Sequence, residues 1–162
     1  WSPDGKYLVY LTSRDPLRYQ DALTVRSVET GQTRELRPNL AAFTWPRWAP
    51  DGRSFAVQGR DIKGRQGIYR VDAQTAEVSP LVQSLPGDVS YTPQWAPDGK
   101  RIFYRRLDSP AKEAVIIERD LASGKEHELW RGKFATIPTM GLSVAPDGRY
   151  VVVANSGSDT PR

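Results

Sequence analysis

Short runs of apolar and β-branched residues recur along the chain, and polar segments separate them. The first run of each set follows Pro-Asp-Gly and a basic residue: "KYLVYL" (6–11), "RSFAVQ" (53–58), "KRIFYR" (100–105) and "RYVVVA" (149–154). A polar loop leads to the second run: "ALTVRSV" (22–28), "GIYRVD" (67–72) and "AVIIERDL" (114–121). Runs of this length and composition predict β-strands. No segment has a sustained helical period.

Two further runs complete each set. A turn, with Gly in two of three cases, leads to a short third run: "TRELR" (33–37), "VSPLV" (78–82) and "EHELW" (126–130). The last run, "TWPRW" (44–48) or "YTPQW" (91–95), ends one residue before the next Pro-Asp-Gly. Each unit of about 47 residues therefore predicts four short strands.

The whole pattern repeats with a nearly constant period. Equivalent positions are Trp1, Trp48, Trp95 and Val144, so the spacings are 47, 47 and 49 residues. Periods of this size indicate a propeller or a solenoid. Four antiparallel strands per repeat favour an all-β propeller, because solenoid repeats are usually shorter or helical.

We expect repeat units at approximately 1–43, 44–90, 91–139 and 140–162 within one partial propeller over 1–162. These units correspond to three near-complete four-stranded blades and half of a fourth. Propellers close with about four to eight blades, so we expect an arc of a larger ring of about six to eight. The remaining blades of that ring are then expected to be partners of this arc.

The repeated motif is interpreted as a corner of each blade. An Asp carboxylate accepts hydrogen bonds from turn amides, Gly tolerates positive φ, and Pro suits a strand end because it has no amide hydrogen. Trp can fill the space between blades. Because the same corner recurs in every unit, we assign its residues to structure: Trp1, Asp4, Gly5, Trp48, Asp51, Gly52, Trp95, Asp98, Gly99, Asp147 and Gly148.

At these residues the sequence resembles the WD40-like repeats of the TolB type. Residues 1–6 have the full signature Trp-Ser-Pro-Asp-Gly-Lys, 48–53 and 95–100 have Ala for Ser, and 144–149 have Val for Trp. The resemblance covers essentially the whole chain and implies a periplasmic scaffold that binds protein partners. Similar blades occur in propellers that gate prolyl-oligopeptidase-type peptidases, in polysaccharide lyases and in sensor regions of bacterial regulators. The motif therefore identifies a fold more specifically than a function.

Composition removes several classes of chemistry. The chain has no cysteine, which excludes disulfides and thiolate sites, and no apolar run approaches the roughly 18 residues of a membrane span. The net charge is +4, but Lys and Arg are scattered among acids, which argues against the dense basic stripe of nucleic-acid binding. The lack of thiols fits a periplasmic or other extracytoplasmic compartment, with the cytoplasm as the alternative.

Candidate catalytic groups are few. His127 is the single histidine and lies on a predicted outer strand, so we expect it to be a solvent-exposed residue without a catalytic role. Ser143 lies in "GLSVA", which lacks the second Gly of a nucleophile elbow. The paired carboxylates are expected to be solvated as well: Glu126 with Glu128, and Asp15 with Asp21. We therefore predict no catalytic residue, metal or cofactor in this segment, and the parent protein's activity stays open.

Binding is expected at one end of the blades, where the connections differ most. We call this end the loop rim: connections 12–21, 59–66 and 105–113, with the lead-ins to the inner strands at 38–44, 85–91 and 132–138. Variable loops on a rigid scaffold are where binding usually occurs. Arg and Tyr are good interface residues, and Arg pairs with carboxylates. The candidate binding residues are Arg18, Tyr19, Arg65, Arg105 and Arg106.

The sequence therefore predicts a non-catalytic propeller module that binds a protein or peptide, acidic in character, through the loop rim. One alternative is the gating, substrate-selecting propeller of a prolyl-oligopeptidase-type serine peptidase whose catalytic domain is outside this chain. A second alternative is a carbohydrate-active propeller.

Overall fold

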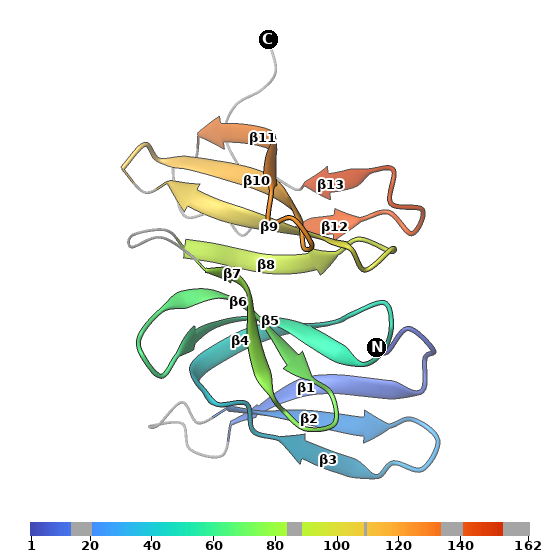
Figure 1. The fold of residues 1–162 in the computed structure, drawn as a ribbon. Coiled ribbons are helices and arrows are strands. Elements are labelled where there is room, and N and C mark those ends of the chain that lie inside the picture. Colours follow the sequence, from blue (N-terminus) through green and yellow to red (C-terminus); the bar gives the residue numbers. More distant parts are fainter. Residues whose placement is uncertain (14–20, 84–88, 109, 134–140, 154–162) are drawn as a thin grey trace. The chain divides into compact units, whose positions relative to one another are not determined.

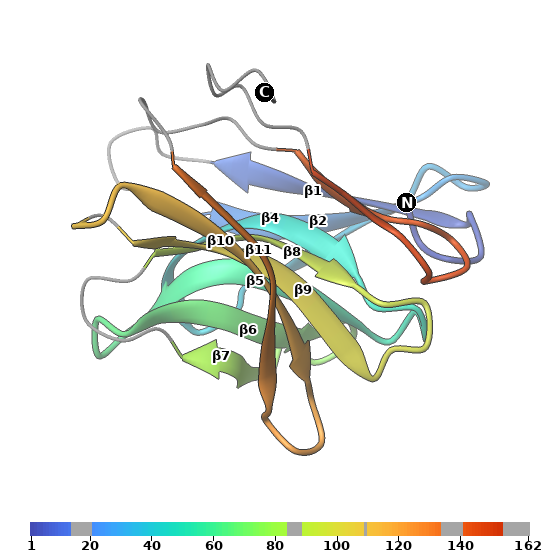
Figure 2. The ribbon, with the colours of Figure 1, turned by 90° about the horizontal axis from the view of Figure 1, so that it is seen from above.

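A computed structural model describes residues 1–13, 21–83, 89–108, 110–133 and 141–153 (Figures 1 and 2). Every regular element in these residues is a β-strand, which confirms the prediction of an all-β chain. Within the described ranges there is accordingly no helix that could cross a membrane. The chain divides into two compact units, Trp1–Ser84 and Leu85–Arg162, and each is described separately.

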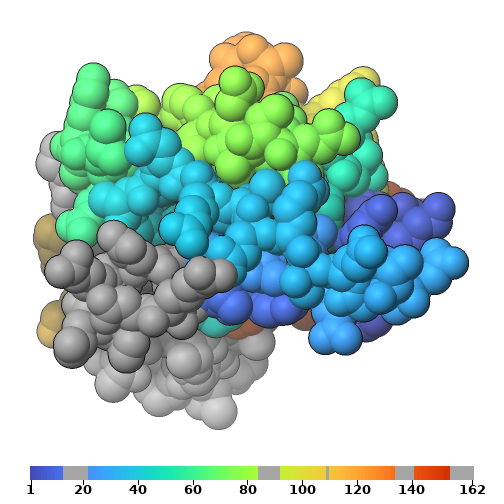
Figure 3. All heavy atoms as spheres, turned by 90° about the horizontal axis from the view of Figure 1, so that it is seen from below, coloured from blue at the N-terminus to red at the C-terminus, as the bar shows by residue number. Residues whose placement is uncertain are grey.

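Unit 1 contains two antiparallel sheets in which strands that are neighbours in sequence are neighbours in space (Figure 1). The first sheet consists of β1 (Tyr7–Ser13), β2 (Asp21–Ser27) and β3 (Thr33–Leu36). The second consists of β4 (Leu40–Trp48), β5 (Ser54–Asp61), β6 (Gln66–Asp72) and β7 (Val78–Gln83). The short outer strands β3 and β7 lie on an exposed face of this unit (Figure 3).

Unit 2 repeats this arrangement. Its four-stranded sheet contains β8 (Val89–Trp95), β9 (Arg101–Asp108), β10 (Glu113–Asp120) and β11 (Glu126–Lys133), in sequence order. The strands β12 (Leu142–Val144) and β13 (Val151–Val153) form a second, two-stranded sheet. The prediction of four-stranded antiparallel blades is confirmed by β4–β7 and β8–β11. The exact boundaries of the repeat units stay a prediction.

Each Pro-Asp-Gly turn is closed by the same hydrogen bonds. The Oδ1 atom of Asp51 accepts from the amide of Arg53 at 2.9 Å, and the amide of Gly52 donates to the carbonyl of Ala49 at 2.9 Å. Gly52 has φ of 68°, a conformation that favours glycine. Equivalent aspartate and glycine contacts occur at three other turns: Asp4 with Gly5, Asp98 with Gly99, and Asp147 with Gly148.

The tryptophans of the repeats lie in different surroundings. Trp48 packs against the apolar cluster that joins the two sheets of unit 1, with its ring 4.2 Å from that of Phe55 between centroids. Trp95 is 8% exposed in unit 2. Trp1 is 70% exposed. The difference follows from the strands, because Trp48 and Trp95 end β4 and β8, whereas Trp1 belongs to no strand.

The inner strands of both four-stranded sheets contain an irregularity that the sequence pattern did not predict. Trp45 and Pro46 stand opposite the single residue Val57, and Thr92 and Pro93 stand opposite Tyr104. The residue before each proline has positive φ, 56° at Trp45 and 50° at Thr92. A bulge suits proline because the ring has no amide hydrogen to give to the neighbouring strand.

Candidate functional site

The loop-rim connections are shorter than the sequence pattern predicts. Strand β9 continues to Asp108 and β10 begins at Glu113, so most of the predicted loop 105–113 is strand. The lead-in 38–44 is likewise mostly part of β4. The pattern is misleading here because these strand ends carry polar and small residues whose backbones are nevertheless paired.

Arg105 and Arg106 are therefore not loop residues. Arg105 lies in β9, which pairs with β8 on one side and β10 on the other. It is 6% exposed, so its side chain is not available at the surface. Arg106 points to the other face of the sheet, as adjacent strand residues do, and its Nη1 lies 3.4 Å from Oε2 of Glu126. The prediction that these two residues stand together on a loop is wrong.

Arg65 lies in a compact turn between β5 and β6, at the loop-rim end of the sheet. Oδ1 of Asp61 accepts hydrogen bonds from the amides of Lys63 and Arg65, both at 2.9 Å. Oδ2 of Asp61 accepts from Nε of Arg65 at 2.7 Å. Gly64 has φ of 84°, and the hydroxyl of Tyr69 donates to the carbonyl of Arg65 at 2.8 Å. This turn is fixed by its own side chains.

The electrostatics of this turn follow from the same contacts. Burial alone would raise the pKa of Asp61, but hydrogen bonds from Arg65 and Lys63 and the charge of Arg65 lower it below its ordinary value. The carboxylate is therefore ionised at neutral pH and keeps the turn closed. Outside it, Ile62 is 67% exposed, and Lys63 and Arg65 are exposed too. The turn presents one apolar side chain and two cations.

The predicted binding residues Arg18 and Tyr19 lie outside the described residues. Arg65 is the predicted residue that the structure places in an exposed loop-rim turn. Its neighbours Ile62 and Lys63 were not on the predicted list, although the glycine at 64 is a turn signal visible in the sequence.

Of the residues considered as catalytic candidates, those that the structure describes are exposed on strands or bonded to neighbouring side chains. His127 is exposed on β11, and Ser143 is exposed on β12. Oε1 of Glu126 accepts hydrogen bonds from the Tyr104 hydroxyl at 2.6 Å and from Arg119 at 2.8 Å. Asp15 lies outside the described residues, as does the side chain of Asp21.

Glu128 is also engaged on the surface. Its carboxylate is 2.6 Å from Arg131, whose hydrogen bond and charge lower the pKa of Glu128. A lowered pKa is the opposite of what a general acid needs at neutral pH. Over the described part of the chain, no group of three or more His, Cys, Asp or Glu residues could hold a metal ion.

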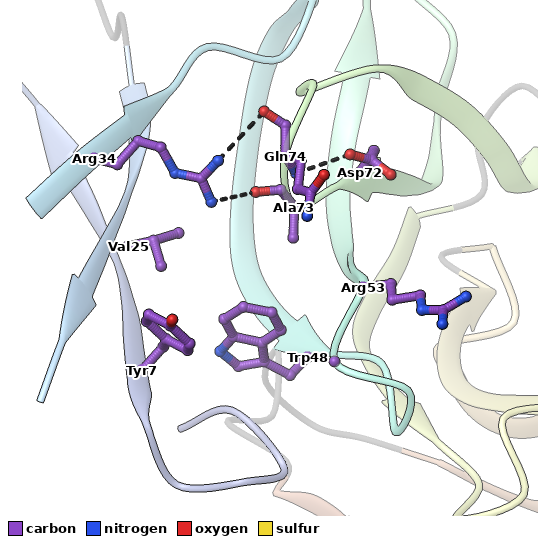
Figure 4. Close-up of a pocket in the computed structure, with 9 residues that line it drawn as sticks. Tyr7, Val25, Arg34, Trp48, Arg53, Asp72, Ala73 and Gln74 are labelled. Atoms are coloured by element: carbon purple, nitrogen blue, oxygen red, sulfur yellow. Dashed lines mark hydrogen bonds between the residues drawn. The ribbon is translucent and has the colours of Figure 1, made fainter.

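Sequence reasoning missed a pocket in unit 1, at the opposite end of the sheets from the loop rim (Figure 4). It has a volume of about 500 Å³ and lies between the two sheets of the unit. Nη2 of Arg34 donates to the carbonyl of Ala73 at 2.6 Å, and Nη1 donates to that of Gln74 at 3.4 Å. No sequence motif predicts this pocket, because its lining comes from β1, β2, β3, β4, the end of β6 and two separate turns.

Comparisons with known proteins agree on the fold. An uncharacterized protein of Agrobacterium fabrum is 28% identical over 160 residues, which cover 96% of this chain and 49% of that protein. The Tol-Pal system protein TolB of Francisella tularensis is 26% identical over 158 residues, which cover 98% of this chain and 35% of TolB. An uncharacterized peptidase of Bacillus subtilis is 31% identical over 92 residues, which cover 54% of this chain and 14% of the peptidase.

Solved structures are similar to the chain at lower sequence identity. TolB from Acinetobacter baumannii matches with a TM-score of 0.72 and 22% identity, over 93% of this chain and 35% of TolB. An oligogalacturonate lyase matches with 0.63 and 14%, over 96% of this chain and 48% of the lyase. The propeller domain of the Trilobed protease from Pyrococcus furiosus matches with 0.59 and 14%, over 95% of this chain and 53% of that domain.

The solved structures confirm the β-propeller architecture, and at these identities they show the fold alone. The chain spans about half the length of the Agrobacterium relative and about a third of the Francisella TolB. The family model described as "TolB beta propeller domain" matches residues 1–162, and the four Pro-Asp-Gly turns are spread over the same range. The chain belongs to the TolB β-propeller domain family.

Proposed function

We propose that the chain is a non-catalytic propeller module that binds a protein or peptide partner at the loop rim, with the β5–β6 turn as the central contact. The observation that carries this proposal is the preformed turn of Asp61 to Arg65. A fixed turn loses little conformational entropy on binding, so its exposed side chains are effective contact groups. Family membership supports a scaffold role, because relatives of this chain are Tol-Pal system proteins.

The chemistry of the turn defines the partner. Lys63 and Arg65 are exposed cations, and Ile62 offers a 67% exposed aliphatic side chain between Asp61 and Lys63. The complementary surface carries carboxylates beside an apolar patch. Arg65 already pairs with Asp61 through Nε, so its terminal nitrogens are the atoms that face a partner carboxylate.

The test uses the full-length protein and a partner recovered with it from the source cells, then purified. Affinity is measured by calorimetry for Ile62→Ser, Lys63→Ala and the two combined. We expect the combined variant to bind about tenfold more weakly, and the affinity of the unmodified protein to fall as salt rises. Lys6→Ala and Lys125→Ala, at exposed positions at the opposite end of the sheets, are the controls. Weakened binding by the controls alone means that the chosen face is wrong.

A second candidate is the gating propeller of a serine peptidase. It is favoured by one observation, the 31% identity with an uncharacterized peptidase over 92 residues. The sequence has no Gly-x-Ser-x-Gly nucleophile elbow, so for this candidate the nucleophilic serine would belong to another domain of the same protein. Peptidase activity of the full-length protein, lost when the Ser of a Gly-x-Ser-x-Gly segment outside this chain is replaced, would favour this candidate over a scaffold. The similarity to an oligogalacturonate lyase concerns the fold alone.

We also propose an extracytoplasmic location, as the resemblance to TolB implies and as the lack of cysteine allows. Fractionation of the source cells tests this proposal. Recovery of the full-length protein with cytoplasmic marker enzymes would contradict it.

A further inference from the structure

We propose that the pocket of unit 1 is a second binding site, which takes an apolar group carrying a carboxylate. This site is independent of the loop rim and lies at the opposite end of the sheets. Its walls are the rings of Tyr7 and Trp48 and the side chain of Val25, and Arg34 stands over them (Figure 4). A volume of about 500 Å³ lies within the usual range of a small-ligand site, and the lining is mixed, with apolar side chains at Tyr7, Val25 and Trp48 beside charged and polar ones.

The guanidinium of Arg34 is held in place by neutral groups. Its two bonds go to the carbonyls of Ala73 and Gln74, which leaves further N–H groups of the planar fork available. No carboxylate of the described residues forms an ion pair with it. Asp72 is near enough for Arg34 to help lower its pKa, but Oδ1 of Asp72 already accepts the amides of Gln74 and Thr75, both at 2.8 Å. The charge of Arg34 is therefore oriented, and the nearby carboxylate of Asp72, which also lines the pocket, offsets part of it without a direct ion pair.

The pocket contains the Asp72 carboxylate and a further buried donor. The indole N–H of Trp48 is buried and has no acceptor among the described residues. It lies on the side of the ring nearest Tyr7, whose side chain is 41% exposed (Figure 4). A buried donor without an acceptor is costly, so a ligand oxygen that reached this N–H would relieve it. Arg53 contributes little here, because its guanidinium points away from Trp48 (Figure 4).

The equivalent place in unit 2 shows that this pocket is not a necessary consequence of the repeat. Tyr7 and Val25 of unit 1 correspond to Arg101 and Glu118 of unit 2. In both units the first residue begins the inner strand of the pair, and the second lies on the neighbouring strand two residues before its partner. Arg101 is bonded there to Glu118 at 2.6 Å and to Asp98 at 3.1 Å. The position of Arg34, opposite Val25, holds His127 in unit 2, opposite Glu118. Unit 2 therefore has its arginine at the Tyr7 position and in ion pairs, whereas unit 1 has an arginine on its outer strand above two aromatic rings.

The oriented guanidinium of Arg34, above the apolar side chains of Tyr7, Trp48 and Val25, complements a carboxylate attached to an aromatic or branched aliphatic group. The carboxylate pairs with the fork of Arg34, and the apolar group lies against Tyr7, Trp48 and Val25. This chemistry belongs both to a free small acid and to the C-terminal residue of a peptide chain. The probes below separate these two sources.

The probes are N-acetylphenylalanine, its amide, the peptide Ala-Ala-Ala-Phe and the amide of that peptide. Binding to the full-length protein is followed by calorimetry and by the NMR signal of the Trp48 indole N–H, identified by its loss in Trp48→Phe. We expect each acid to bind at least about tenfold more tightly than its amide and to shift the Trp48 signal. A preference for the peptide acid identifies a chain terminus as the ligand, and a preference for N-acetylphenylalanine identifies a free acid.

Arg34→Met should lower the affinity for both acids about tenfold, and Arg34→Lys, which keeps the charge without the fork, should recover part of it. Arg37→Met is the matched control, because Arg37 is an exposed arginine close by in sequence that pairs with Glu35 outside the pocket. Thermal melts verify that each variant is folded. Three results would each overturn the proposal. They are equal affinity for acids and amides, unchanged affinity in Arg34→Met, and no shift of the Trp48 signal at about 10 mM acid.

Discussion

Ala76 occupies a backbone conformation that suits glycine. Its φ is 62°, and the equivalent turns of the other sheets have Gly31 and Gly124 with φ of 70° and 71°. A Cβ atom in this region is strained, so Ala76→Gly should raise the free energy of unfolding by about 1 kcal/mol. Urea denaturation measures this. Ala122→Gly, in an exposed turn position without positive φ, should instead lower stability, and a loss in both variants would contradict the explanation.

The repeat tryptophans should differ in energy as they differ in burial. Trp95 is 8% exposed, and Trp95→Ala removes a large side chain from a packed interior, at an expected cost of about 3–5 kcal/mol in the free energy of unfolding. Trp1 is 70% exposed, and Trp1→Ala should cost well under that amount. Similar costs for the two variants in urea denaturation would show that the repeat position, rather than burial, determines its contribution.

At the level of strands and turns, the turn from Asp61 to Arg65 depends on one carboxylate. In Asp61→Ala the amides of Lys63 and Arg65 lose their acceptor, so their hydrogen exchange should become at least about tenfold faster. Exchange measured residue by residue by NMR tests this. Asp108→Ala removes the carboxylate that accepts from Ala111 in the β9–β10 connection and should leave the amides of Lys63 and Arg65 unchanged.

The sequence predicted most strands because apolar runs and Pro-Asp-Gly turns alternate, and the structure follows these boundaries at β5, β6, β9 and β10 to within a few residues. The sequence-based prediction failed where a strand continues through residues that do not follow the apolar pattern. Residues 105–108 are polar at three of four positions, yet they pair with β10 and bury Leu107 at 4% exposure. The X-Pro bulges at Trp45 and Thr92 were missed because positive φ at these residue types has no signal in the pattern.

For the molecule as a whole, acid should reduce stability. Hydrogen bonds from backbone amides hold the pKa of three turn aspartates below the ordinary 3.8. The donors are Thr75 and Gln74 for Asp72, Lys100 for Asp98, and Arg149 for Asp147. A carboxyl whose pKa is lower in the folded state contributes stability above its unfolded pKa and loses that contribution as pH falls through the folded value. The urea midpoint should therefore be flat near neutral pH and fall below about pH 4.

Asp98→Asn, which cannot ionise, should show a smaller fall of the urea midpoint over the same range. A midpoint that rises between about pH 4 and pH 3, or a variant with the same pH dependence as the unmodified protein, would show that these turns do not control the acid response.

Function is harder to derive than fold at this scale. The family match and the period follow from turns that every blade needs, whereas binding depends on side chains that differ between blades. Arg65 could be proposed from sequence because it lies in a variable connection between two predicted strands. The pocket beneath Arg34 could not, since its lining is separated by up to 67 residues along the chain, from Tyr7 to Gln74. Only the folded packing of the two sheets of unit 1 brings these residues together.

The most direct test of the proposed rim contact is a hydrogen-exchange footprint of the partner on the full-length protein. Exchange is compared with and without saturating partner, peptide by peptide. The account predicts protection at residues 61–66, with no change at the Pro-Asp-Gly turns 49–53 and 96–100. Protection of those turns, with residues 61–66 unchanged, would contradict it.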